Sequence, residues 1–157
     1  MKILILGLGN ELLSDDGVGI MAARRLRMQL CGNADVVESS QSGIALLELF
    51  EGHQKAIVVD AIHTGRHPVG SLLEFAPADL GPVVAPSPHY AGLPEILALA
   101  RQLDLTFPDE IRIFAVETAD MTTIGGSVSE PVAAAMTPLT ERVTAQVRDW
   151  QRQASHA

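Results

Sequence analysis

The chain has 157 residues, with 19 acidic and 11 basic side chains and a formal net charge of −8. This acidic balance argues against non-specific binding of nucleic acid, which needs a basic surface. The length favours a single domain over residues 1–157, and no apolar run approaches the ~20 residues of a membrane-spanning helix. The one cysteine, Cys31, excludes an internal disulfide and a thiolate metal cluster, so we expect a reduced, cytoplasmic protein without membrane insertion.

The first 30 residues predict a strand, a glycine turn and a helix. The apolar run 3–6 is typical of a buried strand, and two glycines after it let the chain turn tightly. Ser14 and Asp15 are expected to cap the helix that follows, whose apolar positions recur at helical spacing over residues 18–30. The turn thereby presents Asp15 and Asp16 at the mouth of a parallel sheet.

A dinucleotide-binding turn is the main alternative for this stretch. Its G-x-G-x-x-G pattern is broken because Leu12 stands at the position of the third glycine. A pyrophosphate would also face the carboxylates of Asp15 and Asp16, which repel it. The turn therefore suits a cation better than a phosphate.

The rest of the chain alternates predicted strands and helices. The strand at 70–75 is expected to run antiparallel at the edge of the sheet, because only a short connection separates it from the strand before it. Pro138 is expected to bend or split the last helix. The order predicts a three-layer α/β/α sandwich with a twisted, mostly parallel five-stranded sheet that includes one antiparallel edge strand. The expected strands cover 35–38, 56–62, 70–75 and 110–116, and the expected helices cover 44–50, 93–103 and 128–151.

Three candidate metal ligands follow predicted strands or loops that reach one edge of this sheet. Asp16 follows the first turn, Asp60 ends a buried strand, and His89 opens a helix after the proline-rich loop 77–88. Ligands of open α/β sheets bind beyond the carboxyl ends of the strands. Two carboxylates and an imidazole could hold nickel, zinc or a similar divalent ion with coordination positions left open. His63, on the turn after Asp60, is a weaker fourth candidate.

Each of the three residues also has a purely structural alternative. Asp16 could favour the positive end of the first helix, an effect of roughly 0.3–1 kcal/mol. Asp60 could accept backbone N–H bonds from the next loop, and His89 could be a surface histidine. The sequence contains no G-x-S-x-G nucleophile elbow and no H-E-x-x-H zinc motif. The residues alone therefore indicate a cation site in an α/β domain.

Three short motifs follow one another along the chain in an order that is characteristic of one protein family. They are GLGNELLSDDGVG at residues 7–19, VDA at 59–61 and SPH at 87–89. In this order and spacing they resemble the signature of the hydrogenase maturation endopeptidases, the family that trims the C-terminal extension from the large subunit of [NiFe] hydrogenases. The resemblance covers nearly the whole chain.

The resemblance implies a twisted, mostly parallel sheet between helices and a single endoproteolytic cut in the hydrogenase large-subunit precursor, made after nickel insertion. Asp16, Asp60 and His89 fall on the metal-binding positions of the family and are the expected catalytic residues. The precursor is expected to supply the nickel, while other divalent ions could occupy the site in vitro. The alternatives are a non-catalytic metal-binding assembly factor and a small-molecule α/β enzyme, the latter disfavoured by the acidic first turn.

Two segments depart from the family pattern. Relatives often carry Asp-Gly-Gly-Thr where this chain has Glu38-Ser39-Ser40-Gln41, a segment expected to border the substrate. Because this segment differs from that of relatives, the sequence does not indicate which hydrogenase precursor is cut. Relatives also often place a proline after the acid at Glu117, where this chain has Thr118.

Overall fold

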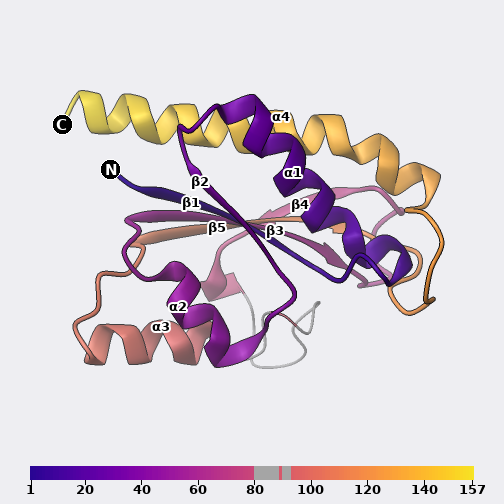
Figure 1. Ribbon diagram of the computed structural model, residues 1–157, viewed down its shortest axis with the longest axis horizontal. Helices are drawn as coiled ribbons and strands as arrows, with labels where there is room; N and C mark the ends of the chain where they lie inside the picture. Colours follow the sequence, from indigo (N-terminus) through magenta and orange to yellow (C-terminus); the bar gives the residue numbers. More distant parts are fainter. Residues whose placement is uncertain (80–88, 90–92) are drawn as a thin grey trace.

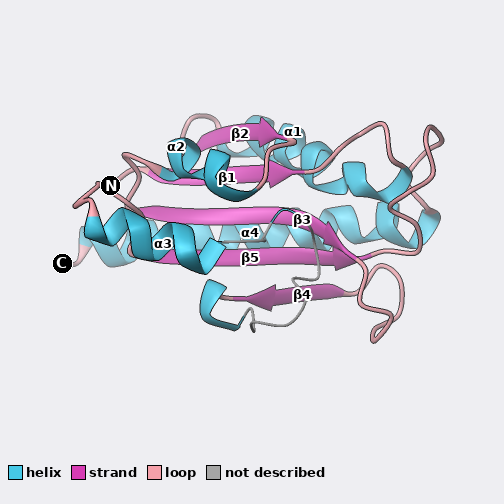
Figure 2. Ribbon diagram, turned by 90° about the horizontal axis from the view of Figure 1, so that it is seen from below, coloured by secondary structure: helices cyan, strands magenta, loops and turns pink. Residues whose placement is uncertain are grey.

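The computed structural model describes residues 1–79, 89 and 93–157, and a five-stranded twisted sheet forms its centre (Figure 1). The strand order is β2-β1-β3-β5-β4, and the first four of these strands run parallel. Strand β4 pairs antiparallel with β5 at one edge, as the opposite direction of its arrow in Figure 2 shows. The predicted sheet is confirmed. Its strands are β1 (Ile3–Leu8), β2 (Asp35–Ser39), β3 (Lys55–Ile62), β4 (Leu72–Phe75) and β5 (Glu110–Glu117).

Helices cover both faces of the sheet, which confirms the three-layer architecture (Figure 1). One face packs against α1 (Val18–Leu30) and α4 (Glu130–Ser155), and the other against α2 (Leu46–Phe50) and α3 (Leu93–Gln102). In β1, isoleucines point to the first face and leucines to the second, because successive strand side chains alternate. Within the described residues, no helix is both long and apolar enough to cross a bilayer.

Of the two effects expected of Pro138, the split is wrong, because α4 runs without interruption through the proline; the bend stays a prediction. A proline removes one i→i−4 hydrogen bond and leaves the carbonyl of Ala134 without its helical donor. Both Ala134 and Pro138 are exposed, so water can reach that carbonyl. The buried stripe from Val132 to Trp150 continues on both sides of the proline and holds the helix on the sheet.

The expected capping role of Ser14 and Asp15 is also wrong. Residues Ser14–Gly17 form a 3-10 helical turn, and neither this turn nor α1 has a side-chain cap. Asp15 is buried and its carboxylate is directed toward the loop between β5 and α4. A polar residue just before a helix is typically a cap, but the carboxylate of Asp15 instead binds a loop that is distant in the sequence.

Two glycines allow this 3-10 turn to approach the sheet closely. A Cβ atom on Gly19 would lie 2.2 Å from the carbonyl oxygen of Leu8 and 2.5 Å from that of Val59, so the first turn of α1 rests directly on β1 and β3. Gly9 has a φ of +152°, and a Cβ there would lie 2.1 Å from the carbonyl oxygen of Asp16. This close packing places Asp16 beside the carboxyl end of β3.

Candidate metal site

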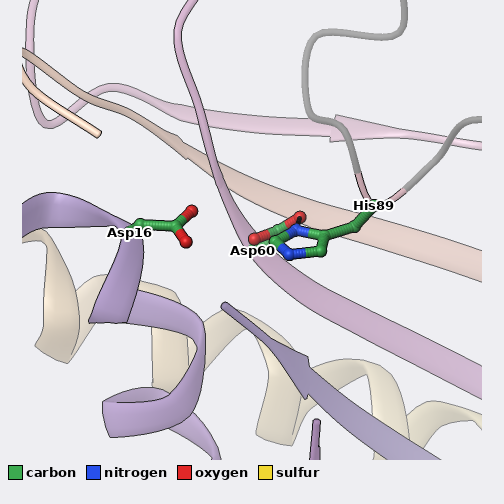
Figure 3. A group of neighbouring side chains, drawn as sticks. All are labelled: Asp16, Asp60 and His89. Carbon is green, nitrogen blue, oxygen red and sulfur yellow. Dashed lines mark hydrogen bonds and ion pairs between the residues drawn. The ribbon is translucent and has the colours of Figure 1, made fainter. Parts of the chain in front are cut away.

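Asp16, Asp60 and His89 gather at the carboxyl edge of the sheet (Figure 3). Asp16 comes from the 3-10 turn after β1, Asp60 from β3, and His89 from the chain between β4 and α3. One possible ligand atom from each of the three lies within 4.8 Å of the other two, and all three side chains are buried. In Figure 3 the carboxylate of Asp16 points toward the pair formed by Asp60 and His89.

Asp60 and His89 form a buried hydrogen-bonded pair. The ring Nδ1 of His89 lies 2.9 Å from Oδ2 of Asp60, while Oδ1 of Asp60 accepts the backbone N–H of Ala61 at 2.8 Å. Burial by itself lowers the pKa of His89, but the hydrogen bond and charge of Asp60, with the charge of Asp16, outweigh it and raise that pKa. When Nδ1 donates its proton to Asp60, Nε2 keeps the lone pair that a metal ion needs.

Asp16 carries the least satisfied polar atom of the site. Its Oδ2 accepts the backbone N–H of Asn10 at 2.9 Å, whereas Oδ1 is buried and has no hydrogen-bond partner in the described part of the chain. Burial and the charge of Asp60 raise the pKa of Asp16, against the smaller opposite effects of Asn10 and His89. A buried oxygen without a donor is costly, and a divalent cation would satisfy it.

The donor set fits a borderline divalent ion such as nickel. Imidazole nitrogen suits nickel and zinc, and carboxylate oxygens can complete part of the coordination. Three protein ligands leave positions for groups from another molecule, as in open rather than closed metal sites. Because none of the three ligands is a thiolate, we expect the protein alone to hold the ion weakly.

Asp15 is a functional neighbour whose role the sequence did not indicate. Its Oδ1 accepts the backbone N–H of Ser129 at 2.6 Å, and its Oδ2 accepts the hydroxyl of Ser129 at 3.0 Å and the N–H of Ala119 at 3.2 Å. The N–H of Asp15 in turn donates to the carbonyl of Asp120 at 3.0 Å. These bonds fix the turn that carries Asp16 to the loop that leads into α4. No local pattern reveals them, because the donors lie more than a hundred residues away.

His63 is not part of the Asp16–Asp60–His89 group. It is exposed, and its Nδ1 lies 2.8 Å from the carbonyl of Thr118. Thr118 donates both its N–H and its hydroxyl to the carbonyl of Ile62, each at 2.8 Å. Relatives often have a proline at this position. A proline would lack the N–H that Thr118 donates to Ile62, so the threonine adds a hydrogen bond between the ends of β5 and β3.

Glu117 is a buried carboxylate with a structural role. It accepts the N–H of Thr64 at 2.8 Å and also the hydroxyl of Thr64. Burial raises its pKa, but the bonds from Thr64 and the backbone of His67, with the charge of His63, lower it overall. Glu117 therefore fastens the β3–β4 loop to the end of β5.

The described fold and site define an α/β protein with a buried carboxylate–imidazole group suited to a divalent metal. Residues 20–146 match a family model described as hydrogenase maturation protease. That range contains Asp60 and His89 and begins after Asp16. The Hydrogenase 2 maturation protease of Escherichia coli (strain K12) is 27% identical over 155 residues, which cover 95% of this chain and 92% of that protein.

A second relative is longer than this chain. The hydrogenase expression/formation protein HupM of Azotobacter chroococcum mcd 1 is 32% identical over 143 residues, covering 87% of this chain and 67% of HupM. Among solved structures, the hydrogenase maturating endopeptidase HybD from E. coli superimposes with a TM-score of 0.81 at 26% identity, covering 95% of this chain and 93% of HybD. The [NiFe] hydrogenase maturation protease HybD from Thermococcus kodakarensis gives 0.75 at 25% identity, over 94% of this chain and 99% of that one.

This chain therefore belongs to the hydrogenase maturation protease family. The predicted family and the peptidase class are confirmed. The two alternatives, a non-catalytic assembly factor and a small-molecule enzyme, are not favoured by these relatives.

Proposed function

We propose that this protein removes the C-terminal extension of a [NiFe] hydrogenase large-subunit precursor after nickel insertion, and that Asp16, Asp60 and His89 contact the nickel of the precursor. The observation that carries the proposal is the buried group itself, in which three ligand atoms lie within 4.8 Å of one another. The Oδ1 atom of Asp16 has no donor among the described residues and is free to become a ligand.

The open coordination of the site suits an ion that arrives already bound to another protein. Nickel held by thiolates of the precursor would complete its coordination with the two carboxylates and the imidazole. The ion would then report that the precursor is loaded and would fix the peptide in place, which lowers the entropic barrier to the cut. A bound nickel ion can also polarise a carbonyl or a water molecule.

Asp60, His89 and Asp16 have different roles in the proposed site, which follow from their different surroundings. Asp60 orients the His89 ring through the 2.9 Å bond to Nδ1 and leaves Nε2 directed away from it. Asp16 offers its Oδ1 atom as a ligand, because Oδ2 already accepts the N–H of Asn10 and Oδ1 has no donor among the described residues. Burial and the charge of Asp60 raise the pKa of Asp16, so a cation beside it also relieves the cost of its ionised form. The sole cysteine of the sequence, Cys31, is exposed at the far end of α1 and does not serve as a nucleophile here.

The test uses purified precursor in nickel-loaded and nickel-free forms, with product masses measured after incubation. We expect loss of a C-terminal peptide from the loaded form alone. Asp16→Asn, Asp60→Asn and His89→Ala should each abolish this cut. Cleavage of the nickel-free form at the same rate would refute metal recognition, and binding of the loaded form without cleavage would point to an assembly factor.

A matched control comes from a second carboxylate–histidine pair. Asp35 and His53 form an ion pair at 3.2 Å at the amino edge of the sheet, where β2 begins and the chain enters β3. Asp35→Asn and His53→Ala should leave processing unchanged. If they impaired it as much as Asp60→Asn and His89→Ala, the effect would not be specific to the proposed site.

A further inference from the structure

Three large apolar side chains are strongly exposed at the carboxyl edge of the sheet, where the metal site lies. Leu12 and Ile124 are 67% and 83% exposed and lie after β1 and β5, and Ile44, 68% exposed, lies in the 3-10 helix Gly43–Ala45 that follows β2. Exposed apolar side chains next to a binding site are typical of surfaces that contact other proteins. The comparably exposed Met28, at 75%, lies in the last turn of α1, which runs back toward the amino edge.

Leu12 and Ile124 lie on two backbone segments that are hydrogen-bonded to each other. Leu13 forms isolated β-bridges with Ile124 and Gly125, and the N–H of Gly125 donates to the carbonyl of Leu12 at 2.8 Å. These backbone contacts join the turn that carries Asp16 to the loop between β5 and α4. Leu12 and Ile124, which we call the rim pair, therefore project from adjoining segments beside the turn that carries Asp16.

The loop that bears Ile124 is also fixed from within. The carboxylate of Asp120 accepts the backbone N–H groups of Thr122 at 2.8 Å and Thr123 at 3.0 Å. Asp15 binds the same loop at Ala119 and Ser129. A rigid display of Ile124 lowers the entropy that a partner must remove on binding.

The rim pair is continuous with the metal site through Asn10. The N–H of Asn10 holds Asp16, and the side-chain Oδ1 of Asn10 accepts the N–H of Leu12 at 3.0 Å. Beside Leu12 the surface is hollowed over about 370 Å³. The residues around this hollow are Gly9, Asn10, Glu11, Leu12, Ile20, Glu38, Ser39 and Ser40.

The charge around the hollow is locally balanced. Arg24 pairs with Glu11 at 2.9 Å and with Glu38 at 3.1 Å, and Arg27 pairs with Glu38 at 2.8 Å. Although the chain carries a net charge of −8, the two acids that border the hollow are already matched by arginines. The surface beside the rim pair thus suits a neutral, apolar segment better than a strongly basic one.

We propose that Leu12 and Ile124 form a docking surface for the folded, metal-loaded precursor and contact apolar side chains next to the segment that is cut. This inference rests on the proposed function. Asp16 is buried, so a metal ion that arrives inside another protein can reach it only if that protein also touches the loops around it. The rim pair supplies apolar contacts on the two loops that adjoin Asp16, and a few well-buried contacts carry most of the binding energy of an interface.

The test compares the double variant Leu12→Ser/Ile124→Ser with Met28→Ser, which removes an equally exposed side chain at the opposite edge. Cleavage of nickel-loaded precursor is followed by mass spectrometry over a range of precursor concentrations. We expect the double variant to raise KM about 10-fold with kcat unchanged, because it removes contacts made equally in the ground state and the transition state. Met28→Ser should keep the KM of the wild type.

The outcomes separate this inference from the proposed function. If the wild type does not cut loaded precursor, the proposed function fails. If the wild type cuts and the folded double variant has an unchanged KM, the docking surface is refuted while the function stands. A fall in kcat alone, or an equal rise in KM for Met28→Ser, would also refute it. Titration of the double variant with Ni²⁺ alone should give the wild-type affinity, because neither side chain belongs to the metal site.

Discussion

The Nδ1 atom of His89 lies 2.9 Å from Oδ2 of Asp60, in a pair closed off from solvent at the end of β3. The negative charge of Asp60 is a main reason why the pKa of His89 is raised despite burial. Because the raised pKa belongs to the folded state, the charged pair stabilises the fold below the ordinary histidine pKa. That contribution is lost as the pH rises through the raised value.

Asp60→Asn should therefore lower the pKa of His89 while the amide keeps a hydrogen bond to the ring. The measurement is a pH titration of the His89 ring signals by NMR, in the wild type and in the variant. Asp35→Asn, which alters only the exposed pair with His53, should leave the His89 titration unchanged. An unaltered His89 pKa in Asp60→Asn would mean that the pair does not form in solution.

Binding of Ni²⁺ to the protein alone should weaken as the pH falls. A metal ion needs His89 neutral and Asp16 ionised, and the pKa of each group is raised in the folded protein. Protons therefore compete for both ligands at mildly acidic pH. Isothermal titration calorimetry between about pH 8 and about pH 5.5 should show steadily lower affinity. Affinity that stays constant over this range would contradict the assignment of these two ligands.

Asp16→Asn should stabilise the fold while abolishing processing. The pKa of Asp16 is raised mainly by burial and by the charge of Asp60. The ionised form therefore costs stability. This cost is absent below the unfolded-state pKa, grows as the pH rises from the unfolded-state to the folded-state pKa, and is constant above it. We expect a gain of about 0.5–2 kcal/mol in the free energy of unfolding near neutral pH, as at other sites where function opposes stability. Urea unfolding at pH 7 measures it, and a clear loss of stability would argue that the carboxylate is satisfied in the metal-free protein.

The fold could be predicted from the sequence because each strand and helix is indicated by the pattern of apolar residues within its own segment. The β-branched run of β3 and the repeating apolar face of α1 each identify an element without knowledge of the others. The convergence of Asp16 and Asp60 on one edge follows from the rule that parallel strands end together. Their hydrogen bonds do not follow from it, because each depends on atomic positions in the folded chain.

The wrong predictions share one cause, which is that long-range packing overrides a local preference. Asp15 has the sequence context of a helix cap, yet the donors of Ser129 and Ala119 hold it in a different contact. Pro138 breaks helices in isolation, yet the buried stripe of α4 keeps the helix intact around it. The predicted loop 77–88 is described only up to residue 79, so most of it lies outside the described residues.

Gly19→Ala should destabilise the protein strongly, because the new methyl group would meet the carbonyl oxygens of Leu8 and Val59 at 2.2 and 2.5 Å. Both are backbone atoms of central strands and cannot turn aside, so α1 must move away from the sheet. We expect a loss of about 3 kcal/mol, at the upper end of overpacking effects. Chemical denaturation measures it against Gly32→Ala, where the surrounding space is open and only the φ of +86° is unfavourable, which costs about 1 kcal/mol. Equal losses at the two positions would contradict the close packing of α1.

Asp15→Asn should lower both stability and processing, although Asp15 touches neither the His89 ring nor the free oxygen of Asp16. Its two oxygens face the backbone donors of Ser129 and Ala119, and an amide group must turn its own NH₂ toward one of them. We expect a loss of about 1.5–3 kcal/mol, because a charged acceptor is removed and a partly buried N–H donor then faces the amide NH₂.

Ser129→Ala is the matched control for Asp15→Asn, since it deletes only the hydroxyl bond at 3.0 Å and should cost about 1 kcal/mol. Urea unfolding of both variants gives the two losses. The processing rate at a temperature where each is fully folded reports the position of Asp16, which is held by the same turn. A stable Asp15→Asn protein with normal processing would show that the turn does not depend on the loop before α4.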